Sequence, residues 1–224
     1  MILSQPIDAV IFDMDGTLHD TERVYHQSLK QAASDVGFPV SDAFCHSLIG
    51  IPGKECDLLL REHVGPGFPF DMFYRRYAEH CERLLEGNIP LKPGVIALLE
   101  YLQEQRLPTA IATSASRQNA LRQLGRSGLH ARLPVVVTRD DVERGKPFPD
   151  LFLQAASRIG VVPERCLAVE DSLNGIRAAH AAGMMPVMVP DLLLPTEDIR
   201  AMCVMVASDL AAVQVFVAER AGTP

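Results

Sequence analysis

The chain has 224 residues, a formal net charge of −7 and 48% hydrophobic residues. That length is enough for one well-packed core and a smaller second domain. The acidic balance argues against a nucleic-acid backbone as the main partner, and no apolar run approaches the roughly 20 residues that cross a bilayer.

The first residues lack the basic and long apolar regions of a secretory signal, so we expect a cytoplasmic protein. The five cysteines are scattered without CxxC or another metal-ligand spacing. We therefore expect free thiols, with neither a disulfide nor a zinc site.

The first expected strand is the short apolar run Ile7–Phe12. From about Thr21 to Leu85 no strand-like alternation follows, and apolar residues recur at helical spacing. Helices are expected around Tyr25–Val36, over Leu58–Val64 and over Met72–Leu85. This region therefore reads as a helical insertion after the first strand.

Strand-length apolar runs then alternate with helical patterns. Strands are expected at Pro108–Thr113, Pro134–Thr138, Cys166–Glu170 and Met185–Val189, and helices at Gly94–Gln105, Ser116–Ser127, Pro149–Ile159 and Ser172–Ala182. This order predicts βαβ units, and hence an α/β fold with a doubly wound, Rossmann-like parallel sheet. The tail after Pro195 is expected to complete the core with a short strand and a helix.

The domain boundaries follow from these two regions. We assign residues 1–20 and 88–224 to the α/β core and residues 21–87 to a helical cap domain. The hinges are expected near Leu18–Asp20 and Gly87–Gly94. A parallel sheet binds ligands beyond the carboxyl ends of its strands.

Polar residues follow the first two strands. Asp13 and Asp15 come directly after the first, and Gly16 lets the chain leave β geometry so that both carboxylates can face one pocket. Thr113 and Ser114 end the second strand before a helix, where hydroxyls and free N–H groups can bind an anion. Taken alone, an acidic turn and an ordinary helix cap would explain these residues.

Two further strand ends carry charge. Lys146 stands between a glycine and a proline, and a fixed ammonium suits a phosphoryl oxygen. Glu170 and Asp171 close a buried strand, where carboxylates need a positive partner. Mg²⁺ prefers one or two protein carboxylates with water and phosphate. Together, the four strand ends supply the parts of an aspartate nucleophile, a phosphate cradle and a magnesium site.

These motifs resemble those of the haloacid dehalogenase (HAD)-like superfamily, in its capped phosphatase branch. All four stand in family order, namely Asp13-x-Asp15-Gly-Thr17, Thr113-Ser114, Lys146-Pro147 and Glu170-Asp171. Within the superfamily the chain looks most like β-phosphoglucomutases and sugar- or nucleoside-phosphate phosphatases. The resemblance covers essentially the whole chain, and it implies a phosphatase of a small phosphorylated metabolite that works through an aspartyl-phosphate.

The resemblance also implies roles for individual residues. Asp13 would be the nucleophile and Asp15 the general acid and base. Mg²⁺ would be held by the Asp13 side chain, the Asp15 carbonyl and Asp171, with Glu170 beside it. Lys146, together with Thr113 or Ser114, would hold the phosphoryl oxygens. The cap would supply specificity; its candidate residues are Glu22, Tyr25, His26, Gly53 and Lys54. We expect a monomer because the cap must move.

Four alternatives are weighed on single residues. Dehalogenases and phosphonoacetaldehyde hydrolases lack an aspartate at the position of Asp15, which disfavours both. In β-phosphoglucomutases a cap histidine and arginine occupy the positions of Tyr25 and Gly53, so transfer to water is favoured over mutase chemistry. A non-enzymatic phospho-ligand-binding protein would lack a catalytic residue, and none is missing. Of the seven histidines we expect none to bind metal, and we expect no chemical role for His19.

Overall fold

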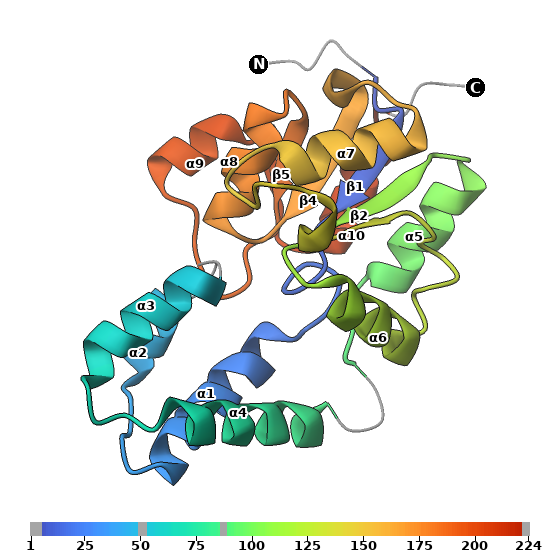
Figure 1. Ribbon diagram of the computed structural model, residues 1–224. Coiled ribbons are helices and arrows are strands. Elements are labelled where there is room, and N and C mark those ends of the chain that lie inside the picture. The colour runs from blue at the N-terminus through green and yellow to red at the C-terminus, as the bar shows by residue number, and fades with distance from the viewer. Residues whose placement is uncertain (1–5, 49–52, 86–88, 221–224) are drawn as a thin grey trace.

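The computed structural model describes residues 6–48, 53–85 and 89–220, and its centre is one parallel β-sheet (Figure 1). The six strands lie in the order β3-β2-β1-β4-β5-β6, and every neighbouring pair is parallel. The strands are β1 (Ala9–Phe12), β2 (Thr109–Ala112), β3 (Val136–Val137), β4 (Cys166–Glu170), β5 (Met185–Met188) and β6 (Met205–Val206). Because β1 is central, the residues that follow it lie at the middle of the carboxyl edge.

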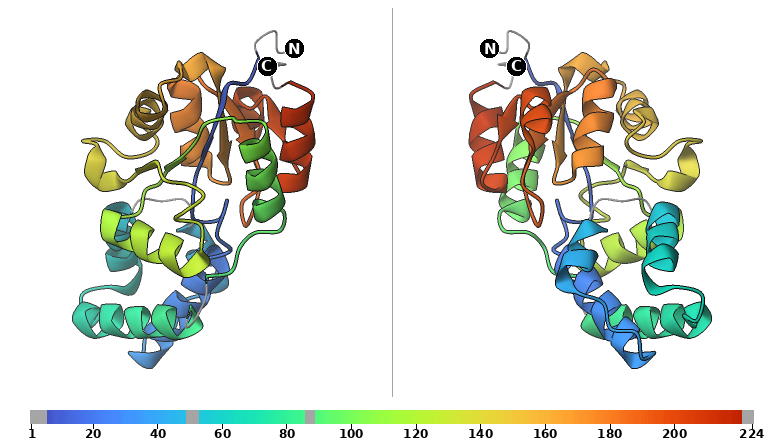
Figure 2. Two further views of the ribbon diagram at one scale, coloured as in Figure 1. Left: turned by 90° about the vertical axis from the view of Figure 1, so that its right-hand side faces the viewer. Right: turned by 90° about the vertical axis from the view of Figure 1, so that its left-hand side faces the viewer.

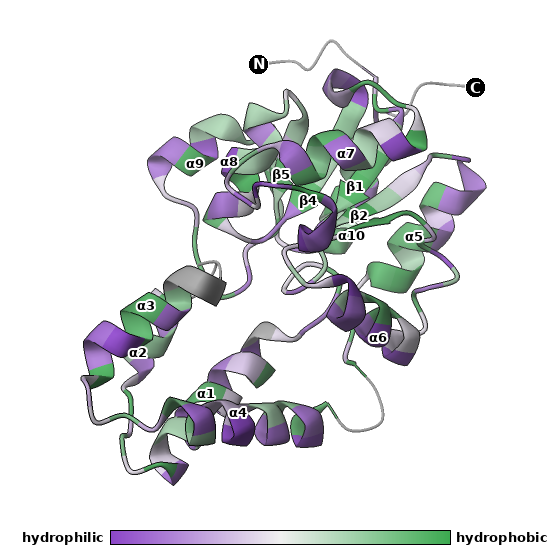
Figure 3. Cartoon of the chain, in the orientation of Figure 1, coloured by the Kyte–Doolittle hydropathy of each residue, from purple (hydrophilic) through white to green (hydrophobic). Residues whose placement is uncertain are grey.

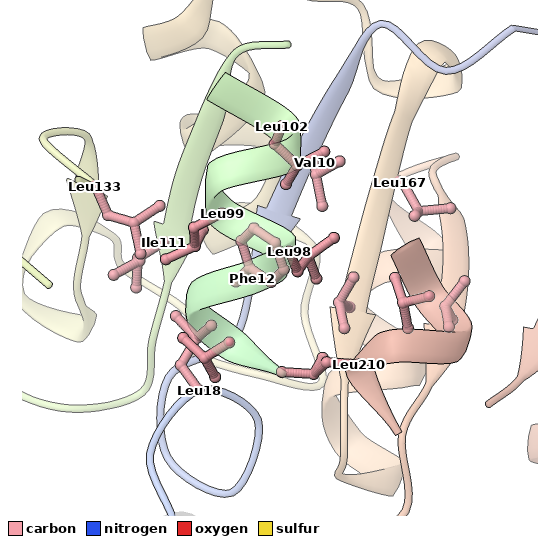
Figure 4. Packing of buried hydrophobic residues seen from close by; sticks show 14 of the residues in the cluster. Val10, Phe12, Leu18, Leu98, Leu99, Leu102, Ile111, Leu133, Leu167 and Leu210 are labelled. Carbon is pink, nitrogen blue, oxygen red and sulfur yellow. The ribbon is translucent and has the colours of Figure 1, made fainter. Parts of the chain in front are cut away.

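The strands are buried on both sides, as expected for a parallel sheet between helices. Val10 and Phe12 of β1 face one hydrophobic cluster, and Ala9 and Ile11 face another. Figure 4 shows Val10 and Phe12 packed against Leu98 of α5 (Val95–Glu104). This alternation fixes the register of β1, because a slip of one residue would exchange the two faces.

Helices cover both faces of the sheet, as the side views show (Figure 2). The first cluster contains residues of α5, α6 (Arg117–Ser127) and α10 (Leu210–Ala218), and the second contains residues of α7 (Asp150–Ile159) and α8 (Leu173–Ala181). A short helix, α9 (Glu197–Met202), packs its Ile199 against α8 and β5. The core is thus a doubly wound α/β sheet.

The chain between β1 and α5 is helical. It forms α1 (Glu22–Asp35), α2 (Asp42–Ser47), α3 (Gly53–Val64) and α4 (Phe70–Leu84). We call these four helices the helical segment. Phe73 and Ala32 belong to a third hydrophobic cluster, which contains only residues of these helices and of the loops between them. In Figure 3, α4 shows mostly hydrophilic residues, whereas the strands of the sheet are largely hydrophobic.

Two linkers join the helical segment to the core, and they lie side by side. The Asp20 N–H donates to Pro90 O (2.8 Å), and the Lys92 N–H donates to Leu18 O (2.9 Å). The Lys92 ammonium also pairs with Asp20 (3.1 Å) and with Asp191 after β5 (2.6 Å). Burial alone would lower the pKa of Lys92, but the two carboxylates raise it above its ordinary value. The entry and exit of the segment are therefore held together and fastened to the core.

The predicted strands and the helices between them are all present. The prediction missed α2 and α9, which have six residues each and are too short to show a helical period. The proposed cap boundary at residue 87 falls outside the described residues. In the part of the chain that the structure describes, no two cysteines form a disulfide. Among the described residues, no helix is both long and apolar enough to span a bilayer.

Candidate active site

The carboxyl edge of the sheet carries a buried lysine between two carboxylates. The backbone of Asp13 continues β1, with its N–H donating to Val169 O at 2.9 Å. Lys146 Nζ lies 2.5 Å from Asp13 Oδ1 and 2.5 Å from Glu170 Oε1. The three residues are at most 7% exposed. Because all three are charged and buried, each depends on the others for its solvation.

Glu170 is held by both of its carboxylate oxygens. Its Oε1 accepts from Lys146, and its Oε2 accepts from the N–H groups of Asp171 (3.0 Å) and Ser172 (2.9 Å) and from the Ser172 hydroxyl (2.9 Å). Helix α8 passes so close that a Cβ at Gly175 would lie 1.7 Å from Glu170 Oε1. Glu170 therefore positions Lys146 and the turn into α8, with neither oxygen left over.

Asp171 lies close to the turn after β1, at Gly16 and Thr17. The Thr17 hydroxyl donates to Asp171 Oδ1 at 3.0 Å, and a Cβ at Gly16 would lie 2.4 Å from Asp171 Oδ2. Gly16 has φ +86°, so both its conformation and the close carboxylate require glycine. Ligand atoms of Asp13, Glu170 and Asp171 all lie within 4.8 Å of one another. The structure thus brings four of the predicted site residues together.

Burial and charge act in opposite directions on this cluster. Burial raises the pKa of the Asp13 carboxyl well above its ordinary value, and the Lys146 ammonium partly offsets that rise. Burial alone would lower the pKa of Lys146, but Asp13 and Glu170 raise it above the ordinary lysine value. The lysine therefore stays protonated, as a contact to phosphoryl oxygens requires.

Asp15 lies in a tight loop that closes on itself after β1. The N–H groups of Leu18 and His19 both donate to Met14 O at 2.9 Å. The Asp15 carboxylate points toward α1, where its Oδ1 accepts from the Thr21 hydroxyl (2.7 Å) and the Tyr25 hydroxyl (3.2 Å). Burial and the neighbouring Asp15 raise the pKa of Tyr25, so the phenol stays protonated and donates.

A chain of hydrogen bonds leads from Tyr25 into the core. Gln123 Nε2 donates to the Tyr25 hydroxyl (2.9 Å), Gln123 Oε1 lies 3.1 Å from His19 Nδ1, and His19 Nε2 lies 2.9 Å from Ser127 Oγ. Burial lowers the pKa of His19, which is fully buried. Gln123 was not identified from the sequence. Its signal was an amide on the buried face of α6, beside Ala120 and Leu124.

The two hydroxyl candidates after β2 differ in exposure. Thr113 is buried, and its Oγ1 accepts from the Ala115 N–H at 3.0 Å, which shapes the turn into α6. Ser114 is exposed. Ser116 caps α6 by accepting from the Asn119 N–H. Of the two candidates, Ser114 is the one that solvent and ligand can reach.

Among the cap candidates for specificity, the two whose side chains are described, Tyr25 and His26, have different partners. Tyr25 contacts Asp15, whereas the ring of His26 stacks on His46 of α2 with centroids 4.9 Å apart. Gly53 and Lys54 are the first residues of α3, and Glu22 is the first of α1. The side chains of Glu22 and Lys54 lie outside the described residues.

Comparison with known proteins agrees with this arrangement. A family model described as haloacid dehalogenase-like hydrolase matches residues 10–189. A phosphorylated carbohydrates phosphatase of Thermotoga maritima is 35% identical over 178 residues, which are 80% of this chain and 82% of that protein. A probable pseudouridine-5'-phosphatase of Drosophila melanogaster is 34% identical, over 84% of this chain and 83% of that one.

Solved structures are similar over nearly the whole chain. A putative β-phosphoglucomutase from Thermotoga maritima superposes with a TM-score of 0.78 at 31% identity, covering 94% of this chain and 98% of that one. A CbbY variant from Rhodobacter sphaeroides, in complex with xylulose-(1,5)bisphosphate, gives a TM-score of 0.68 at 28% identity, over 83% and 87% of the two chains. The fold is therefore shared with these proteins.

Proposed function

Since the chain belongs to the haloacid dehalogenase-like hydrolase family, we propose that it is a Mg²⁺-dependent phosphatase that hydrolyses a small phosphorylated metabolite through an aspartyl-phosphate. One observation carries the proposal: Asp13 lies at the end of the central strand, 2.5 Å from a buried ammonium and beside Asp171. A carboxylate can attack a phosphate dianion only where positive charge offsets their repulsion.

The acidic residues suit a magnesium ion. Asp13, Glu170 and Asp171 present carboxylate oxygens within 4.8 Å of one another, and oxygen ligands are those that Mg²⁺ prefers. Both oxygens of Glu170 already accept hydrogen bonds, so Asp13 and Asp171 would hold the ion, with the Asp15 carbonyl. When bound, the ion supplies Lewis-acid stabilisation of the phosphoryl oxygens.

The side chains then divide the reaction between them. Asp13 attacks phosphorus in line, the bond from phosphorus to the alcohol oxygen breaks, and Asp15 gives that oxygen its proton. Asp15 next removes a proton from the water that hydrolyses the aspartyl-phosphate. Lys146 and Ser114 hold phosphoryl oxygens throughout, and Thr113 shapes the turn that presents Ser114.

The substrate class we propose is a sugar phosphate or a nucleoside monophosphate. The names of the two relatives above, a phosphatase of phosphorylated carbohydrates and a probable pseudouridine-5'-phosphatase, support it. Tyr25 and His26 are engaged by Asp15 and His46, so Gly53 and Lys54 at the start of α3, with Glu22, remain the candidates for contact with the leaving group.

A second candidate function is β-phosphoglucomutase-type phosphoryl transfer. The similarity to a structure described as a putative β-phosphoglucomutase favours it. Against it stands Tyr25, which occupies the position of the mutase histidine and donates to Asp15. The two functions differ in product, because a mutase returns glucose 6-phosphate from β-glucose 1-phosphate without net phosphate release.

The test is phosphate release from sugar phosphates, nucleoside monophosphates and p-nitrophenyl phosphate, with Mg²⁺ and with a chelator. β-Glucose 1-phosphate with a bisphosphate primer is included, and glucose 6-phosphate is followed as its product. We expect release from one preferred ester that stops on chelation while far-ultraviolet circular dichroism stays unchanged. Glucose 6-phosphate without free phosphate would establish the mutase instead.

Asp13→Asn tests the nucleophile. An amide cannot attack phosphorus as a carboxylate does, so we expect turnover to fall by about 10⁴-fold or more. Lys146 keeps Glu170 as its partner, so the fold and the binding of substrate should survive. Hydrolysis by this variant at the wild-type rate would show that Asp13 is not the nucleophile.

A further inference from the structure

We propose that Gln123 and His19 are positioning residues for Asp15, which they orient through the hydroxyl of Tyr25. The inference rests on the proposed role of Asp15 as the proton donor to the leaving alcohol. Neither residue belongs to a family motif, and they lie 104 positions apart in the sequence. In the hydrogen bonds that join them to Asp15, each donor and each acceptor can be assigned.

The assignment starts from the carboxylate. Asp15 Oδ1 accepts from the Thr21 hydroxyl as well, so this oxygen acts as an acceptor and the Tyr25 hydroxyl gives it its single proton. The phenol oxygen can then only accept, which requires the NH₂ end of Gln123 to face it. With its amide in this orientation, Gln123 presents Oε1 to His19.

His19 holds the amide in that orientation. Gln123 Oε1 accepts, so His19 Nδ1 must carry a proton. In the neutral ring Nε2 then faces Ser127 Oγ, whose single proton has two acceptors within reach, His19 Nε2 (2.9 Å) and Leu124 O (3.3 Å). If the amide turned over, its NH₂ group would face a ring N–H and its oxygen would accept the phenol proton. With its ring proton on Nδ1, His19 thus favours the amide orientation that leaves the proton of Tyr25 to Asp15.

The surroundings of Tyr25 explain why its hydroxyl must be held in place. A cavity of about 1040 Å³ lies between α1, α4 and α6, and both Tyr25 and Gln123 line it. Solvent in that cavity competes for the Tyr25 hydroxyl, which is free to rotate about its C–O bond. Tyr25 also lies on α1 of the helical segment, whereas Gln123 lies on α6 of the core. The bond between them thus fixes the hydroxyl relative to the core.

The first experiment compares two leaving groups. Gln123→Met keeps the volume of the side chain and removes its hydrogen bonds. Gln103→Met, at an exposed position of α5, is the matched control. kcat/KM is measured for an alkyl phosphate, whose alkoxide needs a proton, and for p-nitrophenyl phosphate, whose phenolate does not. In an aspartyl-phosphate mechanism kcat/KM covers the steps up to departure of the alcohol.

We expect Gln123→Met to lower kcat/KM by about tenfold for the alkyl phosphate and by about twofold or less for p-nitrophenyl phosphate. Combining it with Tyr25→Phe should add no further loss to that of Tyr25→Phe alone, since Gln123 acts through that hydroxyl. Gln103→Met should leave both values unchanged. Melting temperatures of all variants establish that they are folded.

Two His19 variants provide the second test. Asn places an N–H donor near the position of Nδ1, so His19→Asn should keep the amide of Gln123 in place and retain wild-type selectivity between the two leaving groups. His19→Leu should lose the wild-type selectivity between the two leaving groups, as Gln123→Met does. In the wild type, ¹⁵N chemical shifts should report a neutral ring with its proton on Nδ1.

The outcomes separate the two proposals. An equal loss for both leaving groups, additive effects of Gln123→Met and Tyr25→Phe, or a proton on Nε2 of a neutral His19 would each overturn the positioning role. A wild-type protein that releases phosphate from no ester would overturn the proposed function, and this inference with it.

Discussion

Two hydrogen-bonded networks meet at the carboxyl edge of the sheet, and they differ in charge and in origin. The Lys146 network joins Lys146, Asp13 and Glu170, all fully charged groups contributed by the α/β core. The Asp15 network runs from Asp15 through neutral side chains, and it includes Tyr25 from the helical segment.

The difference separates two tasks. Buried charges hold one another rigidly, because the loss of one partner leaves another unsolvated. Neutral groups can be exchanged for water at small cost, so a network built from them can form and break as its two sides move. We infer that the Lys146 network holds the reacting groups, whereas the Asp15 network links proton transfer to the placement of α1.

The largest expected effect separates the networks by charge. Lys146→Met leaves Asp13 and Glu170 buried without their ammonium, so we expect a loss of about 3–5 kcal/mol in the free energy of unfolding. Urea unfolding in the presence of a chelator measures it, because a bound cation would replace part of the lost charge.

Its matched control is Lys30→Met. Lys30 lies 2.5 Å from Asp42, the same distance as in the buried pairs, but both side chains are exposed. Solvent screens that pair, so the expected loss is about 0–1 kcal/mol. Equal losses in the two variants would contradict the view that burial makes the Lys146 network rigid.

An intermediate effect is expected from one added methyl group. A Cβ at Gly175 would lie 1.7 Å from Glu170 Oε1, so Gly175→Ala must displace the carboxylate that holds Lys146. We expect it to cost about 1–3 kcal/mol or more. Gly125→Ala on α6 meets nothing within 4 Å and should instead stabilise by about 0.5–1 kcal/mol, as alanine does within a helix. Thermal unfolding of both variants tests the difference in sign.

The smallest effect is expected at the far end of the Asp15 network. Ser127→Ala removes the hydroxyl beside His19 Nε2. Ser127 is only partly buried, and water can replace it, so we expect at most about 1 kcal/mol of lost stability. A loss as large as that of Lys146→Met would show that the neutral network is as rigid as the charged one.

The networks also differ in how far the sequence could predict them. Asp13 follows β1 and Glu170 ends β4, and apolar runs such as Cys166–Glu170 mark where strands end, whereas Lys146 lies in the loop between β3 and α7. The parallel sheet then brings these ends to one edge, so placement follows from topology alone. The same logic placed Asp171 and Asp15.

No comparable sequence pattern indicated that Gln123 and His19 are in contact. Their contact joins a loop to the second turn of a helix 104 residues away, and depends on how α6 packs against that loop. His19 was expected to have no chemical role, because a loop histidine gives no sign of its burial. The sequence prediction also missed the helix α2. Its local signal was the helix-capping residue Ser41, whose side chain accepts from the Phe44 N–H.

The paired linkers have a consequence for how this architecture can vary. Asp20 and Pro90 are hydrogen bonded, so the chain leaves the core and returns to it at neighbouring points. A segment inserted between such points spans the same short distance however many residues it has. The loop-closure entropy that it costs grows only slowly with the number of residues inserted. The four helices could therefore be excised, lengthened or exchanged for another module while β1, β2 and the Lys146 network keep their register.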